Sequence, residues 1–175
     1  MNHKIMIVLG LSLMVLPLAA QQPAKPADWS AWKFLLGDWT AGAGGGQPGQ
    51  ASGGGFSFNY DLQKRILVRR SYSEYPATKD SPAFRHDDLM IVYQDPDGKM
   101  TRATFFDNEG HTIQYKVAFS DEGRTAMFLS DEAVPGPRYR FIYRLQKDNS
   151  LSIEFDIAPP GQAFTKYVEG TAKRK

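Results

Sequence analysis

The feature that most constrains this chain is an alternation of apolar and polar residues that recurs from Gly37 almost to the C-terminus. Turn sequences interrupt it about every ten residues, among them Asp95–Gly98 and Asp107–Gly110, and the clearest alternation is His111–Phe119. Each such strand has one apolar face, and an open sheet of about ten strands would leave two edges exposed. The pattern therefore predicts an all-β fold, a closed antiparallel up-and-down barrel of about ten strands. A two-sheet sandwich is the alternative.

A short helix is predicted just before the first strand. Asp28 can cap it, its apolar residues recur at helical spacing, and Gly37 is a stop signal. So short a helix is not stable alone, so we expect it to pack across one mouth of the barrel. The residues of this structural plug are Trp29, Trp32, Gly37 and Trp39.

The first residues are typical of an export signal. Lys4 provides a positive charge, Ile5–Leu16 an apolar core, and Leu18–Ala20 a small-residue end. We expect a signal peptide over 1–20, a polar leader over 21–27, and a barrel domain over 28–175. The predicted location is periplasmic or secreted, with no membrane attachment after cleavage.

The amino-acid composition excludes several kinds of chemistry and gives no support for a nucleic acid partner. The chain has no cysteine, so it forms no disulfide and offers no thiolate, and it cannot be acylated as a lipoprotein. Its formal net charge is +2, and cleavage of the signal removes Lys4. Such a balance gives no reason to expect a nucleic acid partner. The sequence does not indicate an oligomeric state.

Several segments resemble a known family. Phe34–Trp39 looks like the Gly-x-Trp start of lipocalin-like (calycin) barrels. Further stretches are similar to a family of exported bacterial lipocalin-like proteins catalogued as a domain of unknown function: Leu67–Arg70, Glu74–Pro76, His86–Met90, Phe106–His111 and Glu169–Thr171. The resemblance implies a ten-stranded barrel related to fatty-acid-binding proteins and to the haem-binding nitrobindins. It implies no particular activity.

No cofactor is expected. Nitrobindin-type barrels, as that resemblance implies, ligate haem through a histidine near the end of the last strand, and 164–175 contains none. The stretch Gly44–Gly49 fits G-x-G-x-x-G, but no helix follows it, so a loop is predicted. After the signal only His86 and His111 remain, without local ligand spacing, so no metal site is predicted.

Two polar residues share a phase with apolar neighbours and are predicted to face the lumen. His111 is in register with Ile113 and Tyr115, either hydrogen-bonded to the preceding turn or serving as a ligand anchor or proton carrier. Arg70 shares its phase with Tyr72, and either pairs with Glu74 or binds an anionic head group. The predicted ligand-binding set is Arg70, Tyr72, His86, His111, Tyr115 and Tyr143.

The leading functional hypothesis is an exported barrel without catalytic activity. Its ligand would be small and largely apolar, with a polar or anionic end. One alternative is a barrel enzyme of the isomerase or hydratase type, with His111 as the acid–base. Another is a structural or protein-binding barrel whose interior is filled by aromatic side chains.

Overall fold

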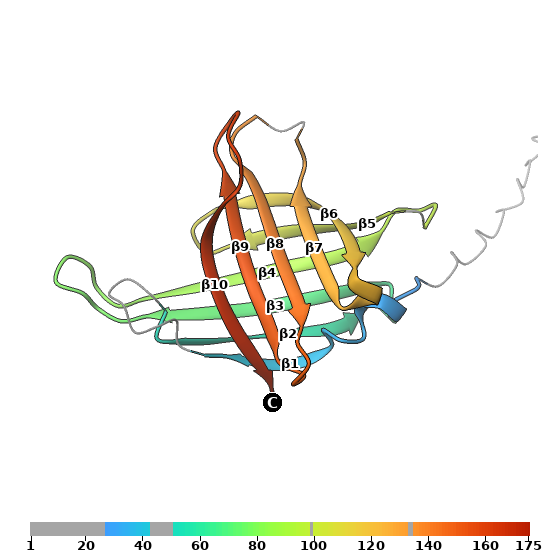
Figure 1. The fold of residues 1–175 in the computed structure, drawn as a ribbon, viewed down its shortest axis with the longest axis horizontal. Helices are drawn as coiled ribbons and strands as arrows, with labels where there is room; N and C mark the ends of the chain where they lie inside the picture. Colours follow the sequence, from blue (N-terminus) through green and yellow to red (C-terminus); the bar gives the residue numbers. More distant parts are fainter. Residues whose placement is uncertain (1–26, 43–50, 99, 133–134) are drawn as a thin grey trace, which may run out of the picture.

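The structure is a computed structural model that describes residues 27–42, 51–98, 100–132 and 135–175. The predicted signal over 1–20, most of the leader and the glycine-rich loop at 44–49 lie outside the described residues. The described part confirms the all-β prediction: ten antiparallel strands close into a barrel, each paired with its neighbours in sequence (Figure 1). The strands are β1 Gly37–Ala41, β2 Gly53–Asp61, β3 Ile66–Tyr75, β4 Phe84–Gln94, β5 Thr101–Asp107, β6 Thr112–Ser120, β7 Thr125–Ser130, β8 Arg138–Leu145, β9 Leu151–Ala158 and β10 Thr165–Arg174.

The first and last strands close the barrel. In β1 and β10, Trp39 lies opposite Arg174 and Ala41 opposite Ala172. This pairing removes both edges along the length that the two strands share. Beyond it, β10 extends toward the other end of the barrel with a bulge between Lys166 and Val168.

The predicted plug helix is not formed. The described residues before β1 contain a single 3-10 turn, η1, over Ser30–Trp32, in which the Ser30 amide donates to the Asp28 carboxylate at 2.9 Å. Gly37 has a φ of +97° and turns the chain into β1, so the helical pattern has too few residues to nucleate an α-helix. Tertiary contacts of the tryptophans fix this segment instead.

The tryptophans pack against one end of the barrel. Trp29, Trp32 and Trp39 are buried, and the ring of Trp32 lies 5.1 Å from that of Phe119 and 5.8 Å from that of Phe128. The indole nitrogens of Trp29 and Trp39 donate to the carbonyls of Lys64 and Leu35 at 2.7 and 2.9 Å. We call this the closed end. Among the described residues, no helix is long and apolar enough to cross a membrane.

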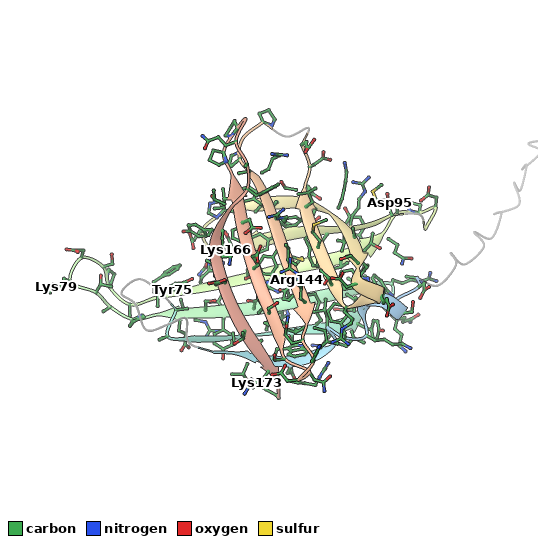
Figure 2. The ribbon with its side chains drawn as sticks, viewed as in Figure 1. Tyr75, Lys79, Asp95, Arg144, Lys166 and Lys173 are labelled. Atoms are coloured by element: carbon green, nitrogen blue, oxygen red, sulfur yellow. The ribbon has the colours of Figure 1, made fainter. Side chains whose placement is uncertain are left out.

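The opposite end is the mouth, where the β3–β4 hairpin projects furthest (Figure 1). Tyr75 at the end of β3 and Asp95 just after β4 mark the two ends of the barrel (Figure 2). The lumen is therefore packed with aromatic rings at the closed end.

Candidate functional site

The most informative residue in the lumen is Arg69 on β3. It is 4% exposed, and its guanidinium forms an ion pair with the carboxylate of Asp88 on β4. Three aromatic rings surround it, with centroids 5.6 Å (Phe56), 5.2 Å (Phe141) and 5.9 Å (Tyr143) from its central carbon. A buried cation thus lies in the middle of the barrel, neutralised by one carboxylate and enclosed by aromatic faces.

Two polar atoms at this place have no hydrogen-bond partner. They are Nε of Arg69 and the hydroxyl of Tyr143, which are both buried. Buried polar atoms are nearly always paired, and leaving one unpaired costs about 1–3 kcal/mol. Side by side, they present two donors to one region of the lumen.

The charges at this centre are well defined. Burial raises the pKa of the Tyr143 hydroxyl and that of Tyr115 well above their ordinary values, so both phenols stay neutral donors. Burial by itself would lower the pKa of Arg69, but the charge of Asp88 and the neighbouring hydroxyls of Tyr143 and Tyr115 together outweigh this and raise it. The centre therefore holds one cation, one carboxylate and two neutral phenols.

Free space adjoins this centre. Gly170 on β10 lies opposite Ile153, and it shares its phase with Ala172, which is buried in the core. Ile153 in turn lies opposite Tyr143, so Gly170 is at the level of the Tyr143 ring. A Cβ added at Gly170 would have no atom within 4 Å. The inner face of β10 is therefore open at the level of the Tyr143 ring, at the position of Gly170.

Aromatic side chains surround the mouth. The rings of Tyr139 and Phe155 stack with centroids 6.0 Å apart, and Tyr167 packs edge-on against Phe155. On the other side, Tyr75 and Phe84 are 6.0 Å apart. Tyr167 is 70% and Phe84 44% exposed, so apolar ring faces are open to solvent at the mouth.

Acidic groups and the two histidines of the described residues, His86 and His111, lie between the mouth and Arg69. His86 on β4 contacts Glu109 through Nδ1 at 2.7 Å, and its Nε2 lies 3.8 Å from Asp88. Asp107, opposite Asp88 on β5, accepts hydrogen bonds from the amide and Nδ1 of His111. Burial by itself would raise the pKa of Asp107. The hydrogen bonds from His111 outweigh the effect of burial and hold the pKa below its ordinary value. Asp107 is thus a carboxylate.

The structure corrects the phase predicted for β3. Its inward residues are Leu67 and Arg69, both buried, so Arg70 and Tyr72 lie on the outer face. The predicted phase was wrong because the apolar residues Ile66 and Val68 lie on the outer face of β3. In addition, one residue that faces the lumen, Arg69, is charged. The predicted pairing of Arg70 with Glu74 does not form, and Glu74 contacts Arg85 instead, at 3.7 Å.

The other predicted ligand-binding residues lie in three places. The rings of Tyr115 and Tyr143 are buried in the lumen and both pack against Phe128. His86 lies between the mouth and Asp88. His111 precedes β6 and its side chain is 57% exposed, held by the Asp107 turn. His111 therefore takes the first of its two predicted arrangements, the bond to the preceding turn.

Sequence reasoning missed Arg69, Asp88 and Gly170. The available signal was the doublets Arg69-Arg70 and Asp87-Asp88. Successive strand residues point to opposite faces, so one member of each doublet must face inward whichever phase is correct.

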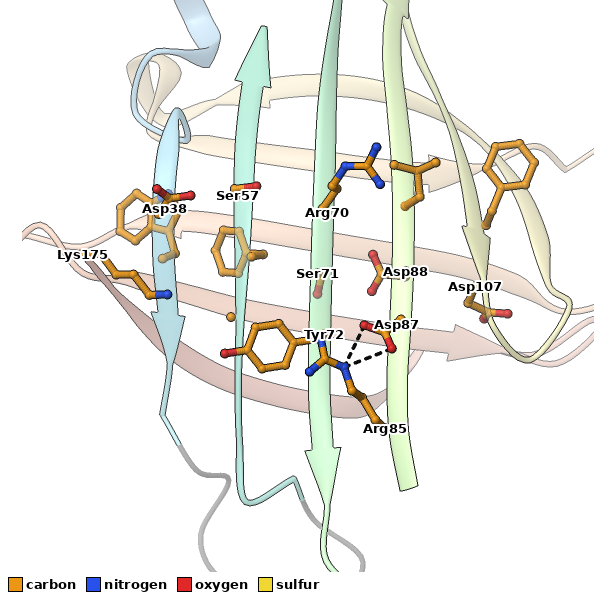
Figure 3. Close-up of a pocket in the computed structure, with 15 residues that line it drawn as sticks. Asp38, Ser57, Arg70, Ser71, Tyr72, Arg85, Asp87, Asp88, Asp107 and Lys175 are labelled. Atoms are coloured by element: carbon orange, nitrogen blue, oxygen red, sulfur yellow. Dashed lines mark hydrogen bonds and ion pairs between the residues drawn. The ribbon is translucent and has the colours of Figure 1, made fainter. Parts of the chain in front are cut away.

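Arg70 and Tyr72 help to line a groove of about 550 Å³ on the outside of β1–β5 (Figure 3). Gly55 gives the Tyr72 ring room, since a Cβ there would lie 3.2 Å from it, and the guanidinium of Arg85 covers the ring at 4.3 Å. Arg85 also bonds Asp87 at 3.0 Å. The groove is open and its arginine–carboxylate contacts are exposed. Among the described residues, no group of three or more histidine or acidic side chains is placed to hold a metal ion.

Comparison with known proteins identifies the fold alone. No family profile and no curated protein matches the chain. A solved structure, "Crystal Structure of Rv2717c from M. tuberculosis", is similar, with a TM-score of 0.60 and 16% sequence identity over 84% of this chain and 96% of that one. The similarity supports a ten-stranded barrel, a fold compatible with ligand binding.

Proposed function

We propose that this protein binds a small, largely apolar molecule in the half of the lumen between Arg69 and the mouth. The observation that carries the proposal is the pair of buried, unpartnered donors, Arg69 Nε and the Tyr143 hydroxyl. A ligand oxygen between them would recover hydrogen bonds that the protein alone leaves unmade. The apolar part of the ligand would lie toward Gly170 and the aromatic rings of the mouth.

The arrangement favours binding over the enzymatic alternative. An acid–base residue must reach the bound molecule, and His111 is exposed and engaged by Asp107 at 2.8 Å. The filled-barrel alternative leaves the two unpaired donors and the space at Gly170 without a role.

Tyr143→Phe tests the anchor by removing one oxygen and keeping the ring. With Prodan, a neutral naphthalene ketone whose emission shifts to the blue in apolar surroundings, we expect saturable binding by the wild type. The variant should bind about 5-fold more weakly, the equivalent of one hydrogen bond of about 1 kcal/mol.

Without ligand, Tyr143→Phe should unfold at the same or a higher denaturant concentration, because it removes an unpaired buried hydroxyl. The matched control is Tyr60→Phe, whose ring packs near Trp29 at the closed end. Equal affinity for Prodan in Tyr143→Phe and the wild type would contradict the proposed anchor.

Gly170→Leu should block the lumen without disturbing the fold. Gly170 has ordinary strand geometry and open space before it, so a leucine there would occupy the space that the ligand needs. We expect at least about a ten-fold loss of Prodan affinity with an unchanged or raised unfolding midpoint, because glycine weakens strands. Thr171→Leu, on the outer face of the same strand, is the control and should bind like the wild type. Full Prodan affinity in Gly170→Leu would place the ligand elsewhere.

We also propose the exported, lipocalin-like character that the sequence suggested. The support is the N-terminal pattern over 1–20 and the Gly37-x-Trp39 start of β1. Mass spectrometry of protein recovered from its native host should find a mature N-terminus near Gln21. Recovery of intact Met1 in the membrane fraction would refute the export signal.

A further inference from the structure

We infer that the lumen selects an apolar ligand whose polar end is an uncharged oxygen, as in a ketone, ester or alcohol, over the carboxylate of the same chain. The inference rests on the proposed function and specifies the class of ligand. It depends on the charges that surround the two free donors.

The charge of Arg69 is already balanced. Its ion pair with Asp88 is nearly solvent-free, with side chains 5% and 7% exposed. A ligand carboxylate would therefore enter a neutral pair and add an unbalanced negative charge in a medium of low polarity. Burying an unpaired charge costs several kcal/mol of binding free energy. Hydrogen bonds from the two free donors stabilise the bound ligand by less than this.

The charges between the mouth and Arg69 also favour an uncharged ligand over a carboxylate. Asp107 lies opposite Asp88 in the sheet, and Glu109 contacts His86, so carboxylates border the route from the mouth. The basic side chains nearby, Arg70 and Arg85, are exposed and belong to the outer face by their strand phase. Among the described lumen residues, the one buried cation is Arg69.

The free donors suit a neutral oxygen. An uncharged carbonyl or hydroxyl oxygen has two lone pairs, and Arg69 Nε and the Tyr143 hydroxyl supply one hydrogen each. Both donors are then satisfied without any change in the total charge of the site. The aromatic faces around Arg69 complete a pocket suited to an uncharged end.

The test compares two ligands with the same chain, dodecan-1-ol and dodecanoate, as competitors of bound Prodan at about pH 8, where a carboxylic acid is ionised. We expect the wild type to bind the alcohol at least about ten-fold more tightly. In Asp88→Asn the charge of Arg69 is unbalanced, so the order should reverse. Asp87→Asn, the neighbouring residue on the outer face, is the control and should keep the wild-type preference.

Asp88→Asn removes half of a buried ion pair, so its folding is checked by circular dichroism. Glu109→Gln provides a second variant that leaves the pair intact and should narrow the preference for the alcohol. Tighter binding of dodecanoate by the wild type, or an unchanged preference in both variants, would overturn the inference while binding in the lumen stands. Failure of Prodan to bind at all would overturn both.

Discussion

Replacing Trp39 by alanine is expected to lower the free energy of unfolding by about 3–5 kcal/mol, the usual cost of deleting a large buried aromatic side chain. Trp39 is 1% exposed, stacks on Phe56 at 6.0 Å and lies under the guanidinium of Arg174 at 4.4 Å. Its indole also donates to Leu35, so one side chain joins β1, β10 and the N-terminal segment. The measurement is equilibrium denaturation followed by circular dichroism.

Two controls separate packing at the closed end from a general loss of aromatic area. Trp39→Phe keeps a stacked ring but loses the hydrogen bond to Leu35, so its loss should be smaller. Tyr167→Ala removes an aromatic ring that is 70% exposed at the mouth, and its effect should be within about 0.5 kcal/mol. Wild-type stability in Trp39→Ala would show that the tryptophans do not hold the closed end.

Replacing Arg69 by methionine should be comparably damaging, for an electrostatic reason. The change leaves the Asp88 carboxylate buried without its partner, which costs about 3–5 kcal/mol. Arg70→Met, one residue away on the outer face, should change stability by no more than about 0.5 kcal/mol. The contrast between adjacent arginines can be measured in one denaturant series.

A double variant identifies the cause of the loss. Arg69→Met combined with Asp88→Leu replaces both charges by apolar groups, and such replacements are often neutral or stabilising. We therefore expect it to recover most of the stability that Arg69→Met loses. Equal losses in the single and double variants would mean that packing, rather than the unpaired carboxylate, determines the cost.

The architecture could be predicted because its signals are local. Alternation and turn chemistry specify ten strands one by one, and closure follows from the cost of open edges. The segment before β1 was predicted incorrectly as a helix. A short 3-10 turn allows the same spacing of tryptophans, and contacts with the barrel position the tryptophan rings. Helical periodicity over so few residues does not decide between the two.

The ion pair of Arg69 and Asp88 in the lumen was not predicted, for a related reason. Strand phase is read from apolar residues, and in β3 the outward Ile66 and Val68 outweighed the inward Leu67. A lumen that contains a charge weakens the contrast on which the method depends. The register that brings Asp88 next to Arg69 is a long-range property of paired strands.

The most direct test of ligand binding in the lumen follows the Nε–H group of Arg69 by ¹⁵N NMR, with Arg69→Lys used to assign the signal. On saturation with Prodan, the Arg69 Nε–H resonance should shift as its unpaired donor gains an acceptor, while that of Arg70 on the outer face should stay in place. A bound probe that shifts Arg70 and leaves Arg69 unchanged would locate the ligand in the outer groove and contradict a binding site in the lumen.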